Sequence, residues 1–376
     1  MIATLGEALV DLIEQKDGRF EAVLGGSVFN FSLGLALQGV ATTYLNPLSS
    51  DRFGTRFAAA ADAAGVARAA RRTSTLPTSL AVVTLDARGS PAYGFYREAV
   101  ADRDASATDL VAALPSPLEL LHSGGLALVP ADLDRNREVL EEALRRGALV
   151  SLDANFRPAA ADDLARYAAG LWSVLGRAHL VKLSEEDLAH LGRGADPFAA
   201  AEELLRGGTT RLVAVTFGAA GAALVSRGAR ARRAPPSDLR VVDTVGAGDC
   251  FFSGLVGWLA RAGHLKRGGL DALDASVLAP ALDHAVASAS LDLTRSGCAP
   301  PTWAETEAFA RAMRGGATAP PPERSPRATS GRGATLSSMA TTKPRVRPAR
   351  RSGKRKTAPR PRPRPKGTTR TGPKKR

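Results

Sequence analysis

The sequence has few cysteines, few aromatic residues and no long apolar run. Its 376 residues include two cysteines, Cys250 and Cys298, and aromatic side chains make up only 5%. Two cysteines cannot build a disulfide scaffold and fit a reducing compartment, so we expect a cytoplasmic protein. No apolar run reaches the roughly 18 residues of a membrane-spanning helix, and the acidic N-terminal segment does not have the composition of a signal peptide. No membrane partner is expected.

Two common nucleotide-binding motifs are also missing. The sequence has no G-x-x-x-x-G-K-[ST] segment, which excludes a P-loop, and its glycines around position 246 are not spaced as G-x-G-x-x-G. Its five histidines show no metal-ligand spacing. Hydrophobic residues make up 44% of the chain, which is enough for a core of one large or two small domains.

The net charge of +14 is concentrated at the C-terminal end. Residues 323–376 hold 19 Lys and Arg against one acid, which leaves residues 1–322 with 32 basic and 36 acidic residues. Few apolar side chains and many prolines predict that residues 314–376 form a disordered basic tail. Such a tail can bind nucleic acid without sequence preference by releasing counterions, and it has no interleaved aromatic residues that would stack on bases. A solvated extension without a function is the alternative.

The most informative stretch is VVDTVGAGDCFFSGLVGW, residues 241–258. Gly246 and Gly248 allow a sharp turn that brings bare N–H groups together, and a helix that starts there adds its positive end, which favours an anion. A carboxylate at such a site, Asp249, would repel phosphate, so its role is that of a base beside a phosphoryl group that is being transferred. The alternative is a Gly-x-Gly turn with an acid in the first helical turn, which is common in proteins without such a site.

The middle of the chain alternates strand and helix patterns. Strands expected at 118–122, 148–152, 179–183 and 212–217 are separated by helices, which predicts a doubly wound, mainly parallel α/β sheet. Ligands bind such sheets at the carboxyl ends of the strands. Polar or glycine residues follow these strands, and we expect Asp249 to follow a strand at Val241–Val242 in the same way.

The N-terminal part predicts a β-hairpin followed by a helix. Two short apolar runs, 8–13 and 20–24, flank a polar turn, and Gly25-Gly26 then precedes a helix that Ser27 can cap. Paired glycines permit close approach of a ligand, and Asn30 offers both a donor and an acceptor to a hydroxyl.

These segments resemble the ribokinase/fructokinase (PfkB-type) family of sugar kinases. DTVGAGD at 243–249 is similar to its D-T-x-G-A-G-D signature, and the residues from Gly6 to Asn30 are similar to G-E-x-L-x-D followed by G-G-x-x-x-N. F-Y-R at 95–97 with A-D-R at 101–103 is most similar to the fructokinase branch. Phe29 stands where many relatives have a small residue, and we expect it to narrow the sugar pocket. The resemblance covers roughly residues 1–309.

The resemblance implies a ribokinase-like kinase domain at 1–313, with a β lid made of residues 8–24 and 80–97, that uses ATP and Mg2+ to phosphorylate a sugar. Asp249 would be the base, beside an anion hole at Gly246, Ala247 and Gly248. The sugar would be held by Asp11, Gly25, Gly26, Asn30, Arg97, Asp153 and Arg157. The nucleotide would be contacted by Lys182, Ser184, Thr216, Gly218, Gly221 and His284. Magnesium would be held by Asp187 or Glu186, and a monovalent cation such as K+ by Asp243.

The resemblance leaves the acceptor and the assembly open. Fructose is the expected sugar, and 2-keto-3-deoxygluconate, ribose or a nucleoside are alternatives in the same family. Two arginines, Arg97 and Arg157, would suit an acidic sugar as well as a neutral one. A homodimer is expected because the family often forms one. A different class of function, a nucleic-acid-associated protein that acts through the tail at 323–376, is the remaining alternative.

Overall fold

A computed structural model describes residues 1–15, 17–70, 72–85, 91–266 and 268–315. The tail predicted at 314–376 therefore falls almost entirely outside the described residues. Its first residue, Arg314, is the last residue of the final described helix.

The larger of two sheets has nine strands among the described residues, in the order β13-β12-β11-β10-β9-β8-β1-β4-β5. The strands from β11 to β5 along this order run parallel, and β12 and β13 are antiparallel additions at one edge, so the expected mainly parallel sheet is confirmed. Their bounds are β1 Ile2–Leu5, β4 Thr42–Tyr44, β5 Ala67–Arg68, β8 Leu120–Gly124, β9 Leu149–Asp153, β10 Leu180–Ser184, β11 Leu212–Thr216, β12 Ala222–Ser226 and β13 Arg230–Arg233.

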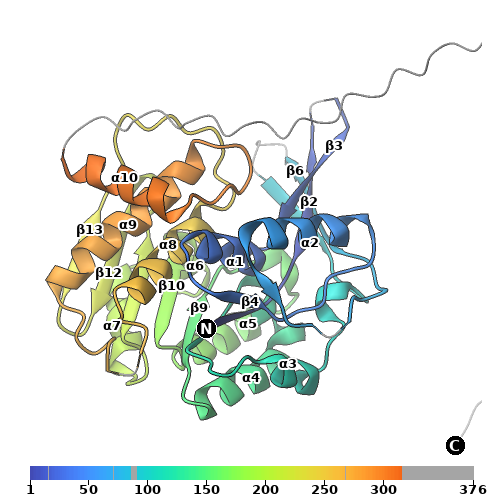
Figure 1. Cartoon of the computed structure of the whole chain (residues 1–376), viewed down its shortest axis with the longest axis horizontal. Helices are drawn as coiled ribbons and strands as arrows, with labels where there is room; N and C mark the ends of the chain where they lie inside the picture. Colours follow the sequence, from blue (N-terminus) through green and yellow to red (C-terminus); the bar gives the residue numbers. More distant parts are fainter. Residues whose placement is uncertain (16, 71, 86–90, 267, 316–376) are drawn as a thin grey trace, which may run out of the picture. The chain divides into compact units, whose positions relative to one another are not determined.

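The smaller sheet has four strands in the order β3-β2-β6-β7 and extends from the upper right of the molecule in Figure 1. Strands β2 (Leu9–Glu14) and β3 (Phe20–Gly25) form the expected antiparallel hairpin, and β6 (Ser79–Leu85) pairs with β2 and with β7 (Pro91–Tyr96). The two segments predicted as a lid, 8–24 and 80–97, thus belong to one sheet.

Helices cover both faces of the large sheet (Figure 1). Successive side chains of a strand point to opposite faces, so Leu120 packs with α1, α8 and α9, whereas Leu121 packs with α4 to α7. The bounds are α1 Ser27–Leu37, α2 Arg52–Ala64, α3 Ala107–Ala113, α4 Pro130–Arg145, α5 Leu164–Leu175, α6 Glu185–His190, α7 Pro197–Arg206, α8 Ala247–Arg261, α9 Ala275–Leu293 and α10 Trp303–Arg314. Among these helices, none has the combination of length and apolarity that a membrane span requires.

The strand register explains why residues far apart in the sequence meet at one edge. Asp153 lies beside Lys182 on the neighbouring strand, and Ser184 lies beside Thr216 on the next one. The carboxyl ends of β9, β10 and β11 therefore form a continuous rim, at which the loops that follow each strand converge.

Two local expectations were wrong. Val241 and Val242 do not form a strand; their side chains are 53% and 58% exposed, and the segment is held by the Val242 N–H, which donates to the Leu293 carbonyl. Asp249 thus follows a loop rather than a strand. Ser27 is the first residue of α1 and not its cap, because Gly26, with φ 100°, occupies the capping position.

Candidate active site

A cavity of about 300 Å3 lies between the rim of the large sheet and one face of the small sheet. The small sheet contributes alternate residues of β2, namely Leu9, Asp11 and Ile13, which share a face because strand side chains alternate. The opposite side is formed by the first turns of α1 and α8, by residues that follow β9 and by Lys182 of β10. The polar side chains that line it are Glu7, Asp11, Ser27, Asn30, Asn155, Arg157, Lys182, Thr244 and Asp249.

Asp249 lies in the first turn of α8, where one of its carboxylate oxygens accepts a hydrogen bond from Asn30 Nδ2 at 2.9 Å. Burial, together with the nearby negative charge of Asp153, raises the pKa of Asp249 to about 7, although the hydrogen bond from Asn30 opposes the shift. A carboxyl group with a pKa near neutrality can take up a proton readily, which is the property that a general base needs.

The turn before Asp249 has the predicted geometry. Gly246 has φ 85° and precedes the first residue of α8. The N–H groups in the first turn of α8 have no acceptor within the helix. Lys182 lies against this turn, since a Cβ at Gly248 would be 3.3 Å from its Nζ. The Ala247 N–H donates to the Thr244 carbonyl at 3.4 Å, so the N–H groups of Gly248 and Asp249 are the ones that face the site without an acceptor in the helix. The site therefore combines a carboxylate, these N–H groups and a buried ammonium group.

Lys182 forms a buried ion pair with Asp153 beside the turn. Its Nζ is 2.9 and 2.8 Å from the two oxygens of Asp153, and both side chains are buried. Burial opposes both charges and raises the pKa of Asp153, but each group favours the charge of the other, and the Asp153 carboxylate raises the pKa of Lys182. The two short contacts from Nζ favour the ionic pair. Asp153 does not line the cavity; it lies behind Lys182 and holds it, which differs from the direct sugar contact that we expected.

Asp11 and Arg157 face each other across the cavity from the small sheet and from the loop after β9. Burial raises the pKa of Asp11 to about 6, and the positive charge of Arg157 opposes this shift. Gly25, the partner of Leu9 on β3, does not line the cavity but leaves room for the Asp11 carboxylate, with which a Cβ at this position would collide. Gly26 does line it, and a Cβ there would lie 2.6 Å from the Glu7 carbonyl oxygen.

A second, mostly apolar cavity of about 680 Å3 lies on the other side of the turn. Thr244 and Gly248 line both cavities, so the turn separates them. Thr216, Gly218 and Gly221, expected near a nucleotide, all line this second cavity, as does Ala247. The sequence did not predict the other residues that line this cavity, which include Ala219, Ala222, Ala234, Pro235, Pro236, Ser237, Leu239, Val241, Phe251, Val286, Ala289, Ser290 and Leu293. Val241 is exposed because it lines this cavity.

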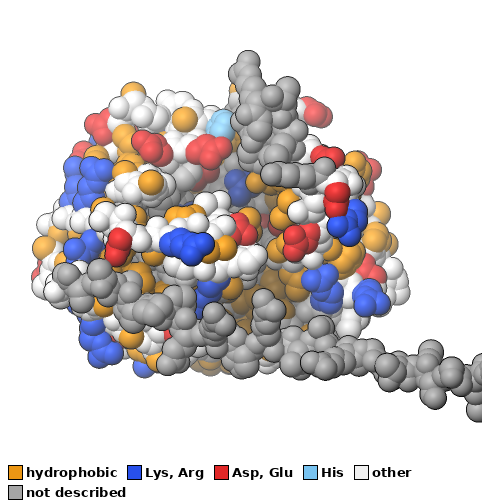
Figure 2. Space-filling view, turned by 90° about the horizontal axis from the view of Figure 1, so that it is seen from above, with side chains coloured by type: hydrophobic (Ala, Val, Ile, Leu, Met, Phe, Trp, Pro, Cys, Tyr) orange, Lys and Arg blue, Asp and Glu red, His pale blue; other side chains and the backbone are white. Residues whose placement is uncertain are grey.

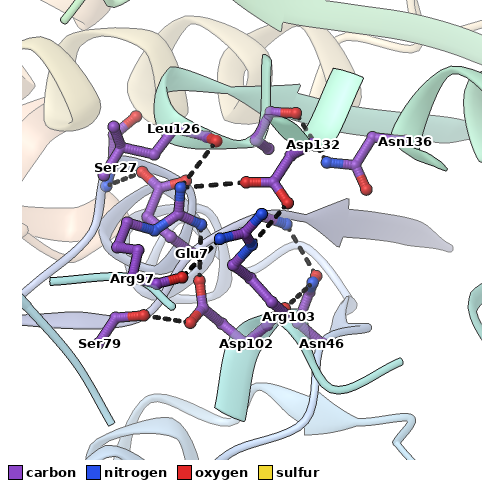
Figure 3. A network of polar contacts seen from close by, with 12 residues as sticks. Glu7, Ser27, Asn46, Ser79, Arg97, Asp102, Arg103, Leu126, Asp132 and Asn136 are labelled. Atoms are coloured by element: carbon purple, nitrogen blue, oxygen red, sulfur yellow. Dashed lines mark hydrogen bonds and ion pairs between the residues drawn. The ribbon is translucent and has the colours of Figure 1, made fainter. Parts of the chain in front are cut away.

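Arg97 does not reach the first cavity. It lies between Asp102 and Asp132 in Figure 3, with nitrogen to oxygen distances of 3.0 and 3.1 Å, and it also donates to the Leu126 carbonyl. Its side chain is 9% exposed. The role expected for Arg97 as a sugar contact is corrected by this network, which ties β7 to the start of α4. Glu7, next to it in Figure 3, does line the cavity and was missed.

Phe29 does not narrow the cavity either. It is fully buried and packs edge-to-face on Tyr44 and Phe57, with ring centroids 5.5 and 4.8 Å away. Position 29 lies on the face of α1 that packs on α2, whereas Asn30, one residue later, points into the cavity.

Glu186 and Asp187, the residues expected to hold magnesium, line neither of the two cavities. Ser184 and Asp187 form a capping box at the start of α6, in which the Asp187 carboxylate accepts the Ser184 N–H at 2.7 Å. The other Asp187 oxygen accepts the Phe156 N–H at 2.7 Å, and Glu186 is exposed. Ser184 therefore caps a helix instead of contacting a nucleotide, and the donors at this position do not fit a magnesium site.

His284 and Asp243 also have other partners. His284 is completely buried, lies 2.8 Å from Glu307 and 2.7 Å from Gln38, and contacts the Trp303 ring, so it does not line the second cavity. Each Asp243 oxygen accepts a backbone N–H, from Val245 at 3.1 Å and from Gly297 at 2.8 Å. Asp243 thus joins the loop before the turn to the loop after α9.

Comparisons with known proteins identify the family of this chain. Residues 1–305 match the model of the pfkB family of carbohydrate kinases. The chain is 30% identical over 282 residues to a fructokinase of Rhizobium leguminosarum bv. trifolii (74% of this chain, 85% of that protein) and 32% identical over 270 residues to a fructokinase of Klebsiella pneumoniae (70% and 85%).

The fold is similar to a crystal structure of fructokinase with bound ATP from Xylella fastidiosa. The TM-score is 0.73 and the identity 30%, over 83% of this chain and 98% of that one. The family match covers more than three quarters of the sequence and includes both cavities and the turn between them. This chain therefore belongs to the pfkB family of carbohydrate kinases.

Proposed function

We propose that this kinase transfers the γ-phosphoryl group of ATP to a primary hydroxyl of fructose, with Asp249 as the base. The observation that carries the proposal is the position of Asp249 at the turn shared by a polar and an apolar cavity. A sugar in the polar cavity and a nucleotide in the apolar one would meet at Gly246–Gly248.

The reaction follows from the groups at this turn. The sugar hydroxyl oxygen forms a bond to the γ-phosphorus, its proton passes to the Asp249 carboxylate, and the bond from phosphorus to the β,γ-bridging oxygen breaks to release ADP. The N–H groups at the start of α8 and the Lys182 ammonium stabilise negative charge on the transferring group; loss of one such donor costs about 10²–10³ in rate. ATP as the donor is supported by the ATP-bound fructokinase of similar fold. Magnesium at Asp187 does not fit, and no step is assigned to it.

The charge of the polar cavity favours a neutral sugar. Three carboxyl groups line it, those of Glu7, Asp11 and Asp249, against two cations, Arg157 and Lys182. Lys182 is already paired with Asp153, and Arg97 is held in its own network outside the cavity. An acidic sugar such as 2-keto-3-deoxygluconate would meet one unpaired cation, which argues for fructose over that alternative. The names of the curated relatives support the same choice.

A substrate panel tests the proposal. Full-length protein would be assayed with ATP and fructose, ribose, 2-keto-3-deoxygluconate or adenosine, with ADP release as the measurement and phosphorus NMR to locate the new ester. We expect the highest kcat/KM for fructose and an ester on a primary carbon. Asp249→Asn, purified in parallel, would control for a contaminating kinase. A tenfold preference for another acceptor would overturn the choice of fructose.

The nucleic-acid alternative concerns a segment that lies outside the described residues. On the face in Figure 2, acidic and basic side chains of the described residues are interspersed, without a continuous basic area. We therefore expect any DNA or RNA binding to be lost when the chain is truncated after Gly315, with sugar phosphorylation retained. Salt-dependent binding that survives truncation would contradict this and move the interaction to the kinase domain. A homodimer and a cytoplasmic location remain predictions from the sequence.

A further inference from the structure

Three potential metal ligands lie together behind the turn, outside both cavities. Cys250 is in the first turn of α8, Asp292 is in the last turn of α9, and Cys298 is in the loop that follows. One ligand atom of each, two sulfurs and a carboxylate oxygen, lie within 4.8 Å of one another. Cys250 and Asp292 are completely buried and Cys298 is half-buried.

The Asp292 carboxylate is the second observation. Its Oδ1 accepts the Ala299 N–H at 2.7 Å, whereas its buried Oδ2 accepts no N–H or O–H group among the described residues, and the Cys250 thiol beside the carboxylate is only a weak donor. A buried carboxylate oxygen without a donor costs free energy unless a cation compensates it. The nearby Arg295 compensates the Asp292 charge only in part, because Arg295 donates to the Ala299 carbonyl and pairs with Glu305.

We propose that Cys250, Cys298 and Asp292 bind a divalent cation with affinity for sulfur, of which Zn2+ is the common example. Two thiolates and one carboxylate are ligands that zinc accepts, and thiolates select against Mg2+ and Ca2+. On binding, two S–H bonds break, two sulfur–metal bonds form, and two protons go to solvent. The assembled site has a net charge of −1.

A disulfide between the same cysteines explains less. Two thiols would be oxidised by an external two-electron acceptor such as a peroxide, which would leave the Asp292 oxygen as it is, buried and without a donor. The carboxylate therefore favours a cation.

The site is coupled to the turn through packing. A Cβ at Gly246 would lie 2.5 Å from the Cys298 Cβ, so the loop after α9 touches the residue that precedes α8. Cys250 directly follows Asp249 in the sequence. A cation bound to both cysteines would join this loop to the first turn of α8, and we expect it to raise the unfolding temperature of the protein.

Cadmium is a suitable probe because its thiolate complexes have an ultraviolet charge-transfer band. The chain has only two cysteines, so this band reports on them alone, whatever ions the histidines or carboxylates bind. We expect the band to saturate at one Cd2+ per chain of full-length protein, with two protons released per ion in weakly buffered solution. Zn2+ would compete for the same site. No band, or a band without a saturable stoichiometry, would overturn the proposal.

Variants distinguish the three ligands. Cys298→Ser and Asp292→Asn should each weaken Cd2+ binding by tenfold or more, and the matched control His264→Ala, a histidine remote from the cluster, should not. Asp292→Asn that binds Cd2+ as tightly as the wild type would overturn the carboxylate as a ligand. If a variant fails to fold, the stoichiometry and proton release of the wild type still decide whether the site exists.

Discussion

Two groups of ionisable side chains lie close together in this kinase and differ in how they are compensated. Around Arg97, the carboxylates of Asp102 and Asp132 are paired with guanidinium groups at 3.0 and 3.1 Å. Around the first cavity, Asp249 and Asp11 have no ion pair among the described residues, and their pKa values are raised to about 7 and about 6. Complete pairing marks a group that holds the fold together, and incomplete pairing at a cavity marks one that can exchange protons.

The largest effect is expected at Asp249. Asp249→Asn removes the proton acceptor and should lower kcat by about 10³, within the usual range for a general base. The unfolding temperature should stay the same or rise slightly, because burial disfavours the charge of Asp249 in the folded state. Steady-state kinetics with fructose and ATP, together with thermal unfolding, would check both. A variant within tenfold of the wild-type rate would rule out this residue as the base.

Arg97→Met should show the opposite pattern. It leaves Asp102 and Asp132 buried with part of their compensation lost, which typically costs about 3–5 kcal/mol. Denaturant unfolding should report this loss, whereas kcat of the folded protein should change by less than tenfold because Arg97 does not line the cavity. Stability within 1 kcal/mol of the wild type would show that the network does not act as the structure suggests. Arg19→Met, an exposed arginine in the hairpin, is the control.

The sequence predicted the side of this comparison that depends on local motifs. Gly246, Gly248 and Asp249 are adjacent in the chain, so turn, helix start and carboxylate could be read together. Asn30 could be placed because paired glycines precede it. Arg97 could not, because its partner Asp132 is 35 residues away and a strand-end arginine can point to a cavity or into a network.

The second cavity was recognised only in part for a similar reason. Its predicted residues, such as Gly218, lie at a strand end, where the pattern of the sheet places them. The other walls come from α9 and from the loop around Pro235, which approach the sheet only in the folded chain. His284 was misplaced because an Ala-rich helix does not reveal from sequence which face meets α10. Val241 was assigned to a strand because the sequence does not show that an apolar residue here lines a cavity.

Glu7 lies between the two groups and connects them. Burial raises its pKa from 4.5 to about 7, although the charge of Arg97 opposes this shift. The folded state therefore holds the Glu7 proton more tightly than the unfolded state, so its contribution to stability is present below pH 4.5 and is lost as pH rises to about 7. Glu7→Gln should remove this loss, on the order of 3 kcal/mol at most. Urea unfolding at pH 5 and pH 8 would measure it, and an equal effect at both values would contradict it.

The smallest effect is expected at Asn30, and it tests whether the raised pKa of Asp249 is used in the reaction. Because the base must be ionised, kcat/KM should fall tenfold per unit below a pH of about 7 and be constant above it. Asn30 donates to Asp249 and so favours its ionised form. In Asn30→Ala the pKa should rise, the acid limb should move to higher pH, and the rate at neutral pH should fall about tenfold. A variant with a lower rate but an unmoved acid limb would mean that Asn30 acts on the sugar alone. In that case the limb belongs to another group, and the incomplete pairing of Asp249 would not be the property on which turnover depends.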